Sequence, residues 1–198
     1  MGILKFTKMQ GTGNDFIMIN GFDFNINNLN NAAKNICDRH FGIGGDGLIL
    51  ILPPENKKND YKMRIFNSDG SEAEMCGNGI RCFAHFLKEK ELTDKTKFKI
   101  ETLAGIVSPM IIKNEGNRSQ VKVNMGRPRF KPEKIPISVE DNNLSYIKEY
   151  KIKIEEEIFK INCVSMGNPH SIIFVDEVDQ YSLEKWGPMI ENYPLFPE

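Results

Sequence analysis

Residues 75–87 read Met-Cys-Gly-Asn-Gly-Ile-Arg-Cys-Phe-Ala-His-Phe-Leu, and the part from Gly79 onward is helical in composition and apolar on most of its sides. A helix that is hydrophobic nearly all round belongs inside a fold and not on its surface. We therefore expect a buried helix over residues 79–87, with the rest of the chain packed around it.

Cys76 follows a polar turn and immediately precedes this helix, so we expect it at the helix N-terminus. The unpaired N–H groups and the dipole at that end favour an anion, which raises the thiolate fraction of a cysteine placed there. Gly77 and Gly79 carry no side chain, so a ligand can approach the backbone donors closely. The segment can thus bind a substrate carboxylate while the thiolate reaches a proton beside it. The alternative is a buried cysteine whose glycines serve close packing.

The flanking segments predict strands and one further helix. Short apolar runs and alternating patterns indicate strands at residues 16–19, 48–52, 61–66, 172–175 and within 96–125. Apolar positions three and four residues apart predict an amphipathic helix over 29–40. We expect the strand at 172–175 to be buried, residues 11–15 to form a loop, and residues 131–160 to form exposed hairpins.

Residues 42–47, Gly-Ile-Gly-Gly-Asp-Gly, match the G-x-G-x-x-G pattern of dinucleotide-binding proteins. That pattern works when a strand precedes the glycines and a helix follows them, so that the pyrophosphate meets a helix N-terminus. Here the predicted order is the reverse, with the helix first and the strand second. We therefore interpret these glycines as a helix end followed by tight turns.

Two short segments share a plan. Gly13-Asn14 and Gly167-Asn168 are each followed within a few residues by an apolar strand, which suggests two structural halves that repeat. We place the halves at residues 1–124 and 125–198, because the Gly-Arg-Pro sequence at 126–128 interrupts the strand pattern. The spacing from Asn14 to Cys76, applied to Asn168, falls at about residue 230, so a second Cys-Gly segment is expected beyond the printed sequence.

Composition excludes several classes of protein. The chain has 198 residues, a length that predicts about 1.3 domains. Its 26 Lys and Arg nearly balance its 27 Asp and Glu, and this near-zero net charge argues against a nucleic-acid partner. Its longest aliphatic run, residues 48–52, is far shorter than the roughly 20 residues of a membrane span. Four cysteines without a C-x-x-C pair predict neither a metal site nor a disulfide scaffold. With no signal-peptide core, we expect a cytoplasmic chain that binds no membrane.

The sequence resembles the diaminopimelate epimerase family, whose members are amino-acid epimerases that work without pyridoxal phosphate. The matching segments are residues 9–16 (MQGTGNDF), 38–47 (DRHFGIGGDG), 64–72 (RIFNSDGSE), 76–82 (CGNGIRC) and 164–170 (VSMGNPH). They are spread through the chain and follow the family's order, so together they are highly specific.

The resemblance implies an α+β fold in which a mixed β-sheet rolls into a barrel around a central helix, in two pseudo-symmetric domains of which the second is incomplete. It implies interconversion of LL- and meso-diaminopimelate, a small-molecule substrate, by two cysteines with no cofactor and no metal, for lysine and peptidoglycan precursor synthesis. Cys76 would be one of the two acid/base cysteines, and His170 would tune the pair or serve as a structural histidine of the cleft. The residues that would contact substrate are Asn14, Asn67, Gly77, Asn78 and Asn168.

The second cysteine of the family falls after the last residue of this chain, and Cys163 is no substitute because no glycine follows it. We therefore expect the full-length parent to epimerise and the 198-residue chain not to, although it can exchange a proton at one face of the substrate. Two alternatives stay open. One is a proline-racemase-like isomerase of the same fold, and the other is a non-catalytic remnant that binds amino acids. An incomplete second domain leaves strand edges uncovered, so a homodimer is also possible.

Overall fold

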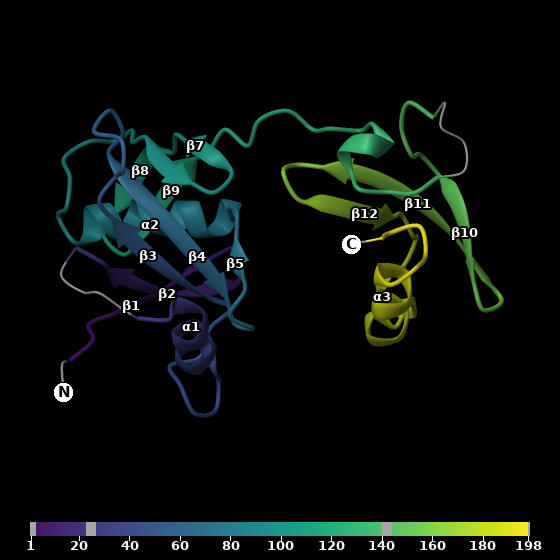
Figure 1. The fold of residues 1–198 in the computed structure, drawn as a ribbon, viewed down its shortest axis with the longest axis horizontal. Helices are drawn as coiled ribbons and strands as arrows, with labels where there is room; N and C mark the ends of the chain where they lie inside the picture. Colours follow the sequence, from purple (N-terminus) through teal and green to yellow (C-terminus); the bar gives the residue numbers. More distant parts are fainter. Residues whose placement is uncertain (1–2, 23–26, 140–143, 198) are drawn as a thin grey trace. The chain divides into compact units, whose positions relative to one another are not determined.

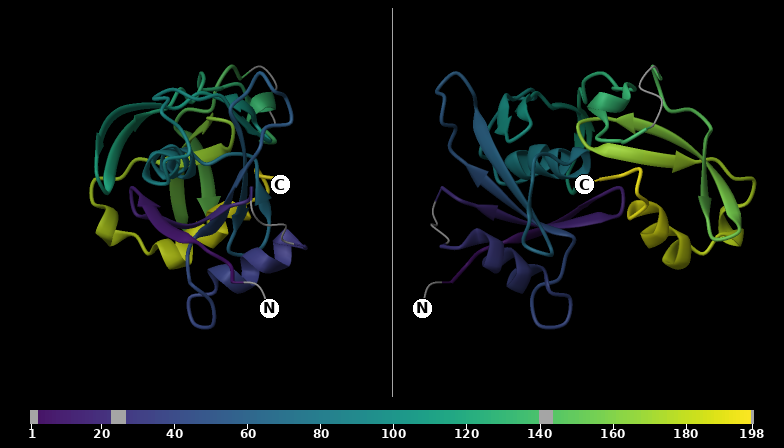
Figure 2. Two further views of the ribbon diagram at one scale, coloured as in Figure 1. Left: turned by 90° about the vertical axis from the view of Figure 1, so that its left-hand side faces the viewer. Right: turned by 45° about the vertical axis from the view of Figure 1, so that its right-hand side comes forward.

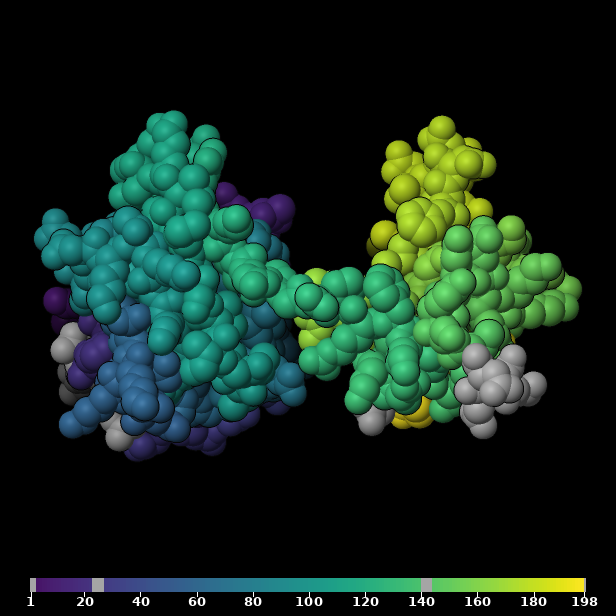
Figure 3. Space-filling model, turned by 90° about the horizontal axis from the view of Figure 1, so that it is seen from above, coloured from purple at the N-terminus to yellow at the C-terminus, as the bar shows by residue number. Residues whose placement is uncertain are grey.

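The computed structural model describes residues 3–22, 27–139 and 144–197. The chain is an α+β protein that divides into two compact units, Met1–Met125 and Gly126–Glu198. Figure 1 shows the elements of each unit, and Figure 3 shows the units in space-filling form, the first in purple to teal and the second in green to yellow. Each unit has its own hydrophobic core.

A mixed seven-stranded sheet forms the frame of the first unit. Its strands are β1 (Thr7–Gly11), β2 (Asn14–Asn20), β3 (Gly47–Leu52), β4 (Tyr61–Asn67), β5 (Glu72–Ala73), β6 (Ile100–Thr102) and β7 (Gly105–Val107). They run in the order β1-β2-β3-β4-β6-β7, with β5 also paired to β4. The β2–β3 and β4–β6 pairs are parallel and the others are antiparallel. A separate hairpin, β8 (Met110–Glu115) and β9 (Arg118–Lys122), joins the segment before β6 through a bridge between Lys97 and Met110.

Helix α2 (Gly77–Glu89) is the buried central helix that its composition predicts. It contacts β1, β2 and β3 as well as both strands of the β8–β9 hairpin. The left view of Figure 2 looks nearly along it and shows strands of the first unit on several sides. Its buried residues are Gly79, Ile80, Cys82, Phe83, Ala84, Phe86 and Leu87. Among the described residues the strand pairing runs from β1 to β7 without returning to β1, so the sheet curves around α2 without closing into a complete barrel.

The apolar run of β3 is explained by burial on both faces of the sheet. Ile49 and Ile51 pack in the cluster that includes α2, whereas Leu48 and Leu50 pack in the cluster that includes helix α1 (Leu29–Cys37). A strand covered on both sides reads as a continuous hydrophobic stretch and does not alternate. This arrangement holds α2 firmly against one face of the sheet.

The order of elements expected around residues 42–47 is confirmed, although α1 ends at Cys37 with Asp38 as its C-cap, so the glycines themselves do not form the helix end. Helix α1 precedes them and β3 follows, the reverse of a dinucleotide-binding motif. A Cβ atom on Gly42 would lie 2.1 Å from the carbonyl oxygen of Asn35, so this glycine serves the close approach of the chain to the end of α1.

The loop predicted at residues 11–15 is shorter than expected, because β1 ends at Gly11 and β2 begins at Asn14. Thr12 and Gly13 form the connecting turn, with φ angles of 56° and 89°. Two-residue hairpin turns favour this left-handed backbone, since its twist matches that of the paired strands. The turn places Asn14 at the first position of β2, opposite Gly11.

The second unit contains a three-stranded antiparallel sheet and a helix. The strands are β10 (Tyr150–Ile154), β11 (Glu157–Ser165) and β12 (Pro169–Ile173), and the helix is α3 (Leu183–Glu191), which was not predicted from the sequence. Two short 3₁₀ helices, η1 (Pro132–Lys134) and η2 (Val178–Gln180), complete it. Phe159 of β11 packs edge-on against Trp186 of α3, with ring centroids 5.2 Å apart.

Two predictions for this unit are wrong. Residues 131–160 are not simply exposed hairpins, because their isoleucines at 135, 137, 147, 152 and 154 form much of its core. The strand expected to be buried at 172–175 is β12, which ends at Ile173 and is exposed: Ile172 is 39% and Phe174 81% accessible. β12 is the edge of its sheet, and only Ile173 of this strand packs against the core of this unit.

No helix in the described segments is both long and apolar enough to cross a bilayer.

Candidate active site at the start of helix α2

Cys76 is the N-cap residue of α2, as predicted. Its backbone is extended, with φ −134° and ψ 121°, and its Sγ accepts a hydrogen bond from the N–H of Gly79 at 3.4 Å. The side chain is half-buried. The N–H groups of Gly77 and Asn78 belong to the same first turn, which has no intrahelical acceptor for them. The sulfur therefore lies beside backbone donors at the positive end of the helix dipole.

The other three thiols are in a different environment. Cys37, Cys82 and Cys163 are all buried. Burial raises the pKa of Cys37 and Cys82 to about 11 and also raises the pKa of Cys163 above its ordinary value. A buried, protonated thiol is neither a nucleophile nor a ready base. Cys76 is thus the accessible thiol of the described chain.

Alkylation rates test this difference. With iodoacetamide at pH 8, we expect Cys76 to be labelled at least about 100-fold faster than the three buried cysteines, which need local opening of the fold before they react. Because the pKa of Cys37 and Cys82 is about 11, their labelling is expected to stay slow up to pH 10 in the folded protein. Peptide mapping by mass spectrometry measures the four rates, and labelling in denaturant is the control. Equal rates for all four cysteines in the folded protein would contradict the assignment.

A chain of side-chain hydrogen bonds joins Asn14 to Asn78, which lies in the first turn of the helix that Cys76 caps. Asn78 Nδ2 donates to Asn14 Oδ1 at 2.7 Å, and Asn14 Nδ2 donates to Asp46 Oδ2 at 2.8 Å. At the other end, Arg81 Nη2 donates to Asn78 Oδ1 and, at 2.7 Å, to the hydroxyl of Thr12. We call the series Arg81–Asn78–Asn14–Asp46 the amide relay. It joins the first turn of α2 to the beginning of β2 and to the residue before β3.

An ion-pair cluster holds the Asp46 end of the relay. Arg39 donates to both carboxylate oxygens of Asp15, at 2.7 and 3.1 Å, and to Asp46 Oδ1 at 2.9 Å. The N–H of Asp15 donates to Asp46 Oδ2 at 3.0 Å, and Lys8 lies 3.1 Å from Asp15. The hydrogen bonds from Arg39 hold the pKa of Asp15 well below its usual range. Asp46, Arg39 and Arg81 were not among the predicted site residues, although all three lie in the segments 38–47 and 76–82 that carried the family resemblance.

The two glycines of the site have different roles. Gly79 is buried, and a Cβ atom there would lie 2.9 Å from Ile49 Cδ1, so its absence of a side chain serves packing against the sheet. Gly77 is half-buried, and a Cβ atom on it would approach only the side chain of Met125, at 3.2 Å. Close packing thus explains Gly79, whereas the role of Gly77 in binding a ligand stays a prediction.

Asn67 lies at the same end of the sheet. It is the last residue of β4, pairs with Gly47 of β3, and is exposed. Its Nδ2 donates to Ser71 Oγ at 2.9 Å, and the N–H of Ser68 donates to the carbonyl of Asp46 at 3.2 Å. The turn after β4 is therefore tied to the residue that ends the amide relay.

Asn168 and His170 belong to the second unit. Asn168 follows Gly167, whose φ is 114°, in the turn between β11 and β12, and His170 of β12 pairs with Val164. Both side chains are exposed. Asn14 and Asn168 each follow a glycine with positive φ at an antiparallel hairpin, but Asn14 is the first residue of β2 whereas Asn168 lies in the turn before β12. Their roles, and that of His170, stay predictions.

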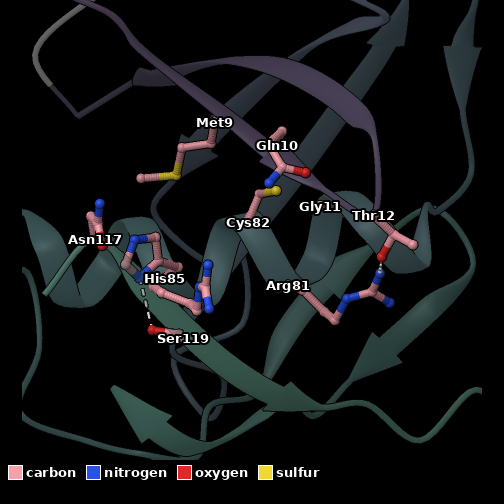
Figure 4. Close-up of a pocket in the computed structure, with 10 residues that line it drawn as sticks. Met9, Gln10, Gly11, Thr12, Arg81, Cys82, His85, Asn117 and Ser119 are labelled. Atoms are coloured by element: carbon pink, nitrogen blue, oxygen red, sulfur yellow. Dashed lines mark hydrogen bonds between the residues drawn. The ribbon is translucent and has the colours of Figure 1, made fainter. Parts of the chain in front are cut away.

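A polar cavity of about 390 Å³ lies along α2 near β1 and β9, and its lining includes Thr12 and Arg81, at one end of the amide relay, but not Cys76. Figure 4 shows His85 and Ser119 within it, joined by a 2.8 Å hydrogen bond between Nδ1 and Oγ. The Ser119 hydroxyl donates its hydrogen to Asn114 Oδ1 at 2.7 Å, so it can only accept a hydrogen bond from His85 Nδ1–H in this arrangement. This pair is therefore not an activated serine nucleophile, which would have to give its proton to the histidine.

Comparisons with solved structures identify the fold. A Bacillus anthracis phenazine biosynthesis protein of the PhzF family superposes with a TM-score of 0.57 at 23% identity, over 89% of this chain and 56% of that one. A hydroxyproline epimerase from Agrobacterium vitis gives a TM-score of 0.65 at 14% identity, over 93% and 55% of the two chains. This chain therefore spans little more than half the length of these structures, and identities this low show the fold alone.

Comparisons of sequence go further. A sequence model of the family described as "Diaminopimelate epimerase" matches residues 6–131. A diaminopimelate epimerase of Halothermothrix orenii is 57% identical over 98% of this chain, and one of Methanococcus maripaludis is 49% identical over the same share; this chain covers 68% of each relative. The family match, the high identity along nearly the whole chain and the thiol at the start of α2 all agree, and the chain belongs to the diaminopimelate epimerase family.

Proposed function

We propose that this chain carries one half of a two-base active site that interconverts LL- and meso-diaminopimelate, with Cys76 as the acid or base at one face of the α-carbon. Inverting a carbon centre needs one base to remove the α-proton and an acid on the opposite face to return one. No cofactor is required for this when the two groups flank the carbon. Two thiols suit the task, because their roles exchange in the reverse direction.

The observation that carries the proposal is the position of the Cys76 Sγ, half-buried at the N-cap of α2 and beside backbone donors. The α-carbon of an amino acid is bonded directly to its carboxylate group, so a sulfur that reaches the α-proton needs a carboxylate site next to it. The N–H groups of Gly77 and Asn78 offer that site. As the α-carbon loses its proton, negative charge spreads onto the carboxylate, and donors fixed in advance stabilise it without reorganising.

The other predicted residues take supporting roles in this proposal. Asn14 and Asn78 would contact the reacting end of the substrate through the amide relay, and Asn67 would contact it from the turn after β4. Asn168 would supply a further contact from the second unit, with His170 tuning the cysteine pair. Cytoplasmic location and a homodimer also remain predictions from the sequence.

Deuterium exchange tests the function. The chain is incubated with LL-diaminopimelate in D₂O, and mass spectrometry and NMR follow the α-position. Because the other three thiols are buried, we expect deuterium to enter at the α-carbon without net formation of the meso isomer. The Halothermothrix orenii relative serves as the positive control for inversion. Binding without exchange would indicate a non-catalytic remnant, and meso product at the relative's rate would contradict the single-thiol interpretation.

A substrate panel tests the isomerase alternative. L-Proline carries an α-proton and a carboxylate but no distal amino acid group, so a proline-racemase-like site would exchange it readily. We expect exchange with LL-diaminopimelate and none above the buffer rate with L-proline. Faster exchange with L-proline would favour the alternative reading of this fold.

A further inference from the structure

The amide relay begins and ends on groups that can play only one hydrogen-bonding role. The Asp46 carboxylate, which faces the guanidinium of Arg39, only accepts hydrogen bonds, and the guanidinium of Arg81 only donates them. Because Asp46 accepts, the Asn14 amide must turn its Nδ2 toward it and its Oδ1 toward Asn78. Because Arg81 donates, the Asn78 amide must turn its Oδ1 toward it. Both ends thus impose the same direction on the two amides between them.

This direction decides what the asparagines can offer a ligand. Each amide NH₂ has two hydrogens and the relay uses one of them, so Asn14 and Asn78 each keep an N–H to donate. If an amide were reversed, it would present its oxygen where the NH₂ now lies. The first turn of α2 adds the backbone N–H groups of Gly77 and Asn78. A carboxylate, with two acceptor oxygens, matches such donors, whereas the NH₂ of a carboxamide would meet another donor.

We propose that Asp46 and Arg81 are positioning residues that lock the amides of Asn14 and Asn78 as donors, so that the site beside Cys76 selects a charged carboxylate over its uncharged carboxamide. This inference rests on the proposed function for its substrate, the α-carboxylate end of an amino acid. It explains why an ion-pair cluster surrounds Asp46, since Arg39 and the N–H of Asp15 fix that carboxylate in place. Neither residue touches the reacting atoms in this proposal.

The test compares two alkylating reagents that differ in the same way as the two ligands. Iodoacetate carries a carboxylate and iodoacetamide a carboxamide, and both react with Cys76. The measured quantity is the ratio of the two rates at Cys76, divided by the same ratio for glutathione, a thiol with no protein site. We expect this normalised ratio to exceed 1 in the unmodified chain, because the locked donors hold the carboxylate of iodoacetate.

Asp46→Asn separates the proposal from simple charge effects. Asparagine can donate as well as accept, so the relay loses its direction, and we expect the normalised ratio to fall about 3- to 10-fold, the effect of about one hydrogen bond. Removal of a negative charge by itself would reduce the repulsion of the iodoacetate anion and so raise the ratio. Asp38→Asn is the matched control: it makes the same charge change at a carboxylate that accepts from the N–H groups of His40 and Phe41. A ratio that is unchanged or raised in Asp46→Asn overturns the proposal.

Arg81 provides a second pair of variants if Asp46→Asn does not fold. Arg81→Lys keeps a donor-only group and is expected to hold the ratio within about twofold of the unmodified chain, whereas Arg81→Gln is expected to lower it several-fold. Equal losses in both variants overturn the proposal. These rates need no diaminopimelate, so the outcome is distinct from that of the deuterium test. If the normalised ratio falls in the variants as expected but the chain exchanges no deuterium, the proposed function alone is contradicted. If the chain exchanges deuterium but the ratio does not respond to the variants, the positioning roles alone are contradicted.

Discussion

Cys76→Ser is expected to lower the rate of deuterium incorporation into LL-diaminopimelate by about 10²- to 10⁴-fold, the usual contribution of a positioned acid or base. A serine hydroxyl is a far weaker acid than a thiol, so almost none of it is ionised near neutral pH. Serine is also a good N-cap residue, and its oxygen can accept the Gly79 N–H that the sulfur now accepts. The start of α2 should therefore be preserved, and the loss should report the chemistry.

The control for this variant is Cys163→Ala. It removes a thiol from the second unit, where Cys163 is buried in strand β11. We expect its exchange rate to stay within about twofold of the unmodified chain, provided that circular dichroism shows it folded. Cys76→Ser retaining more than half of the exchange rate would show that another group removes the α-proton.

Phe83→Ala is expected to destabilise the first unit by about 3–5 kcal/mol, the usual cost of removing a buried aromatic ring. Phe83 is fully buried near the middle of α2 and packs edge-on against Tyr61 of β4, with ring centroids 6.2 Å apart. Alanine is the best helix former, so the helix itself is not weakened by the change. The loss comes from the cavity left between α2 and the sheet that surrounds it.

The unfolding of the first unit can be followed at Cys82, the residue before Phe83 in the sequence. Trp186 is the single tryptophan and lies in α3 of the second unit, so its fluorescence does not report on α2. Cys82 is buried beside Phe83, and its alkylation in increasing guanidinium measures opening of the first unit. Phe41→Ala, at a side chain 96% exposed, is the control and is expected to change stability by less than about 0.5 kcal/mol. A cost below 1 kcal/mol for Phe83→Ala would contradict the central position of α2.

The central helix and the place of Cys76 could be predicted from sequence because both depend on local composition. A helix that is apolar on nearly all of its sides has to be buried, and the residue between it and the preceding polar turn is its N-cap. Strand β1 was missed for the opposite reason. Met9 is its one buried residue among those at 7–11, so no apolar run marks it, and the Thr12-Gly13 turn is the signal that indicates the hairpin.

The amide relay could not be predicted because its members are far apart in sequence. Asn14 bonds to Asp46, 32 residues away, and to Asn78, 64 residues away. Only the pairing of β2 with β3 and the packing of α2 against them bring these side chains together. The exposure of β12 was missed for a related reason. An apolar run predicts a strand, but whether anything covers the strand depends on the neighbouring elements.

The most direct test of the account is protection of Cys76 by the substrate. If the sulfur lies next to the α-carbon, LL-diaminopimelate should slow the alkylation of Cys76 in a saturable way, by at least about tenfold, while the slow labelling of Cys37, Cys82 and Cys163 stays unchanged. L-Lysine, which lacks the second carboxylate, should protect less. A Cys76 alkylation rate that is independent of LL-diaminopimelate concentration in the folded chain would show that this thiol is not in the substrate site.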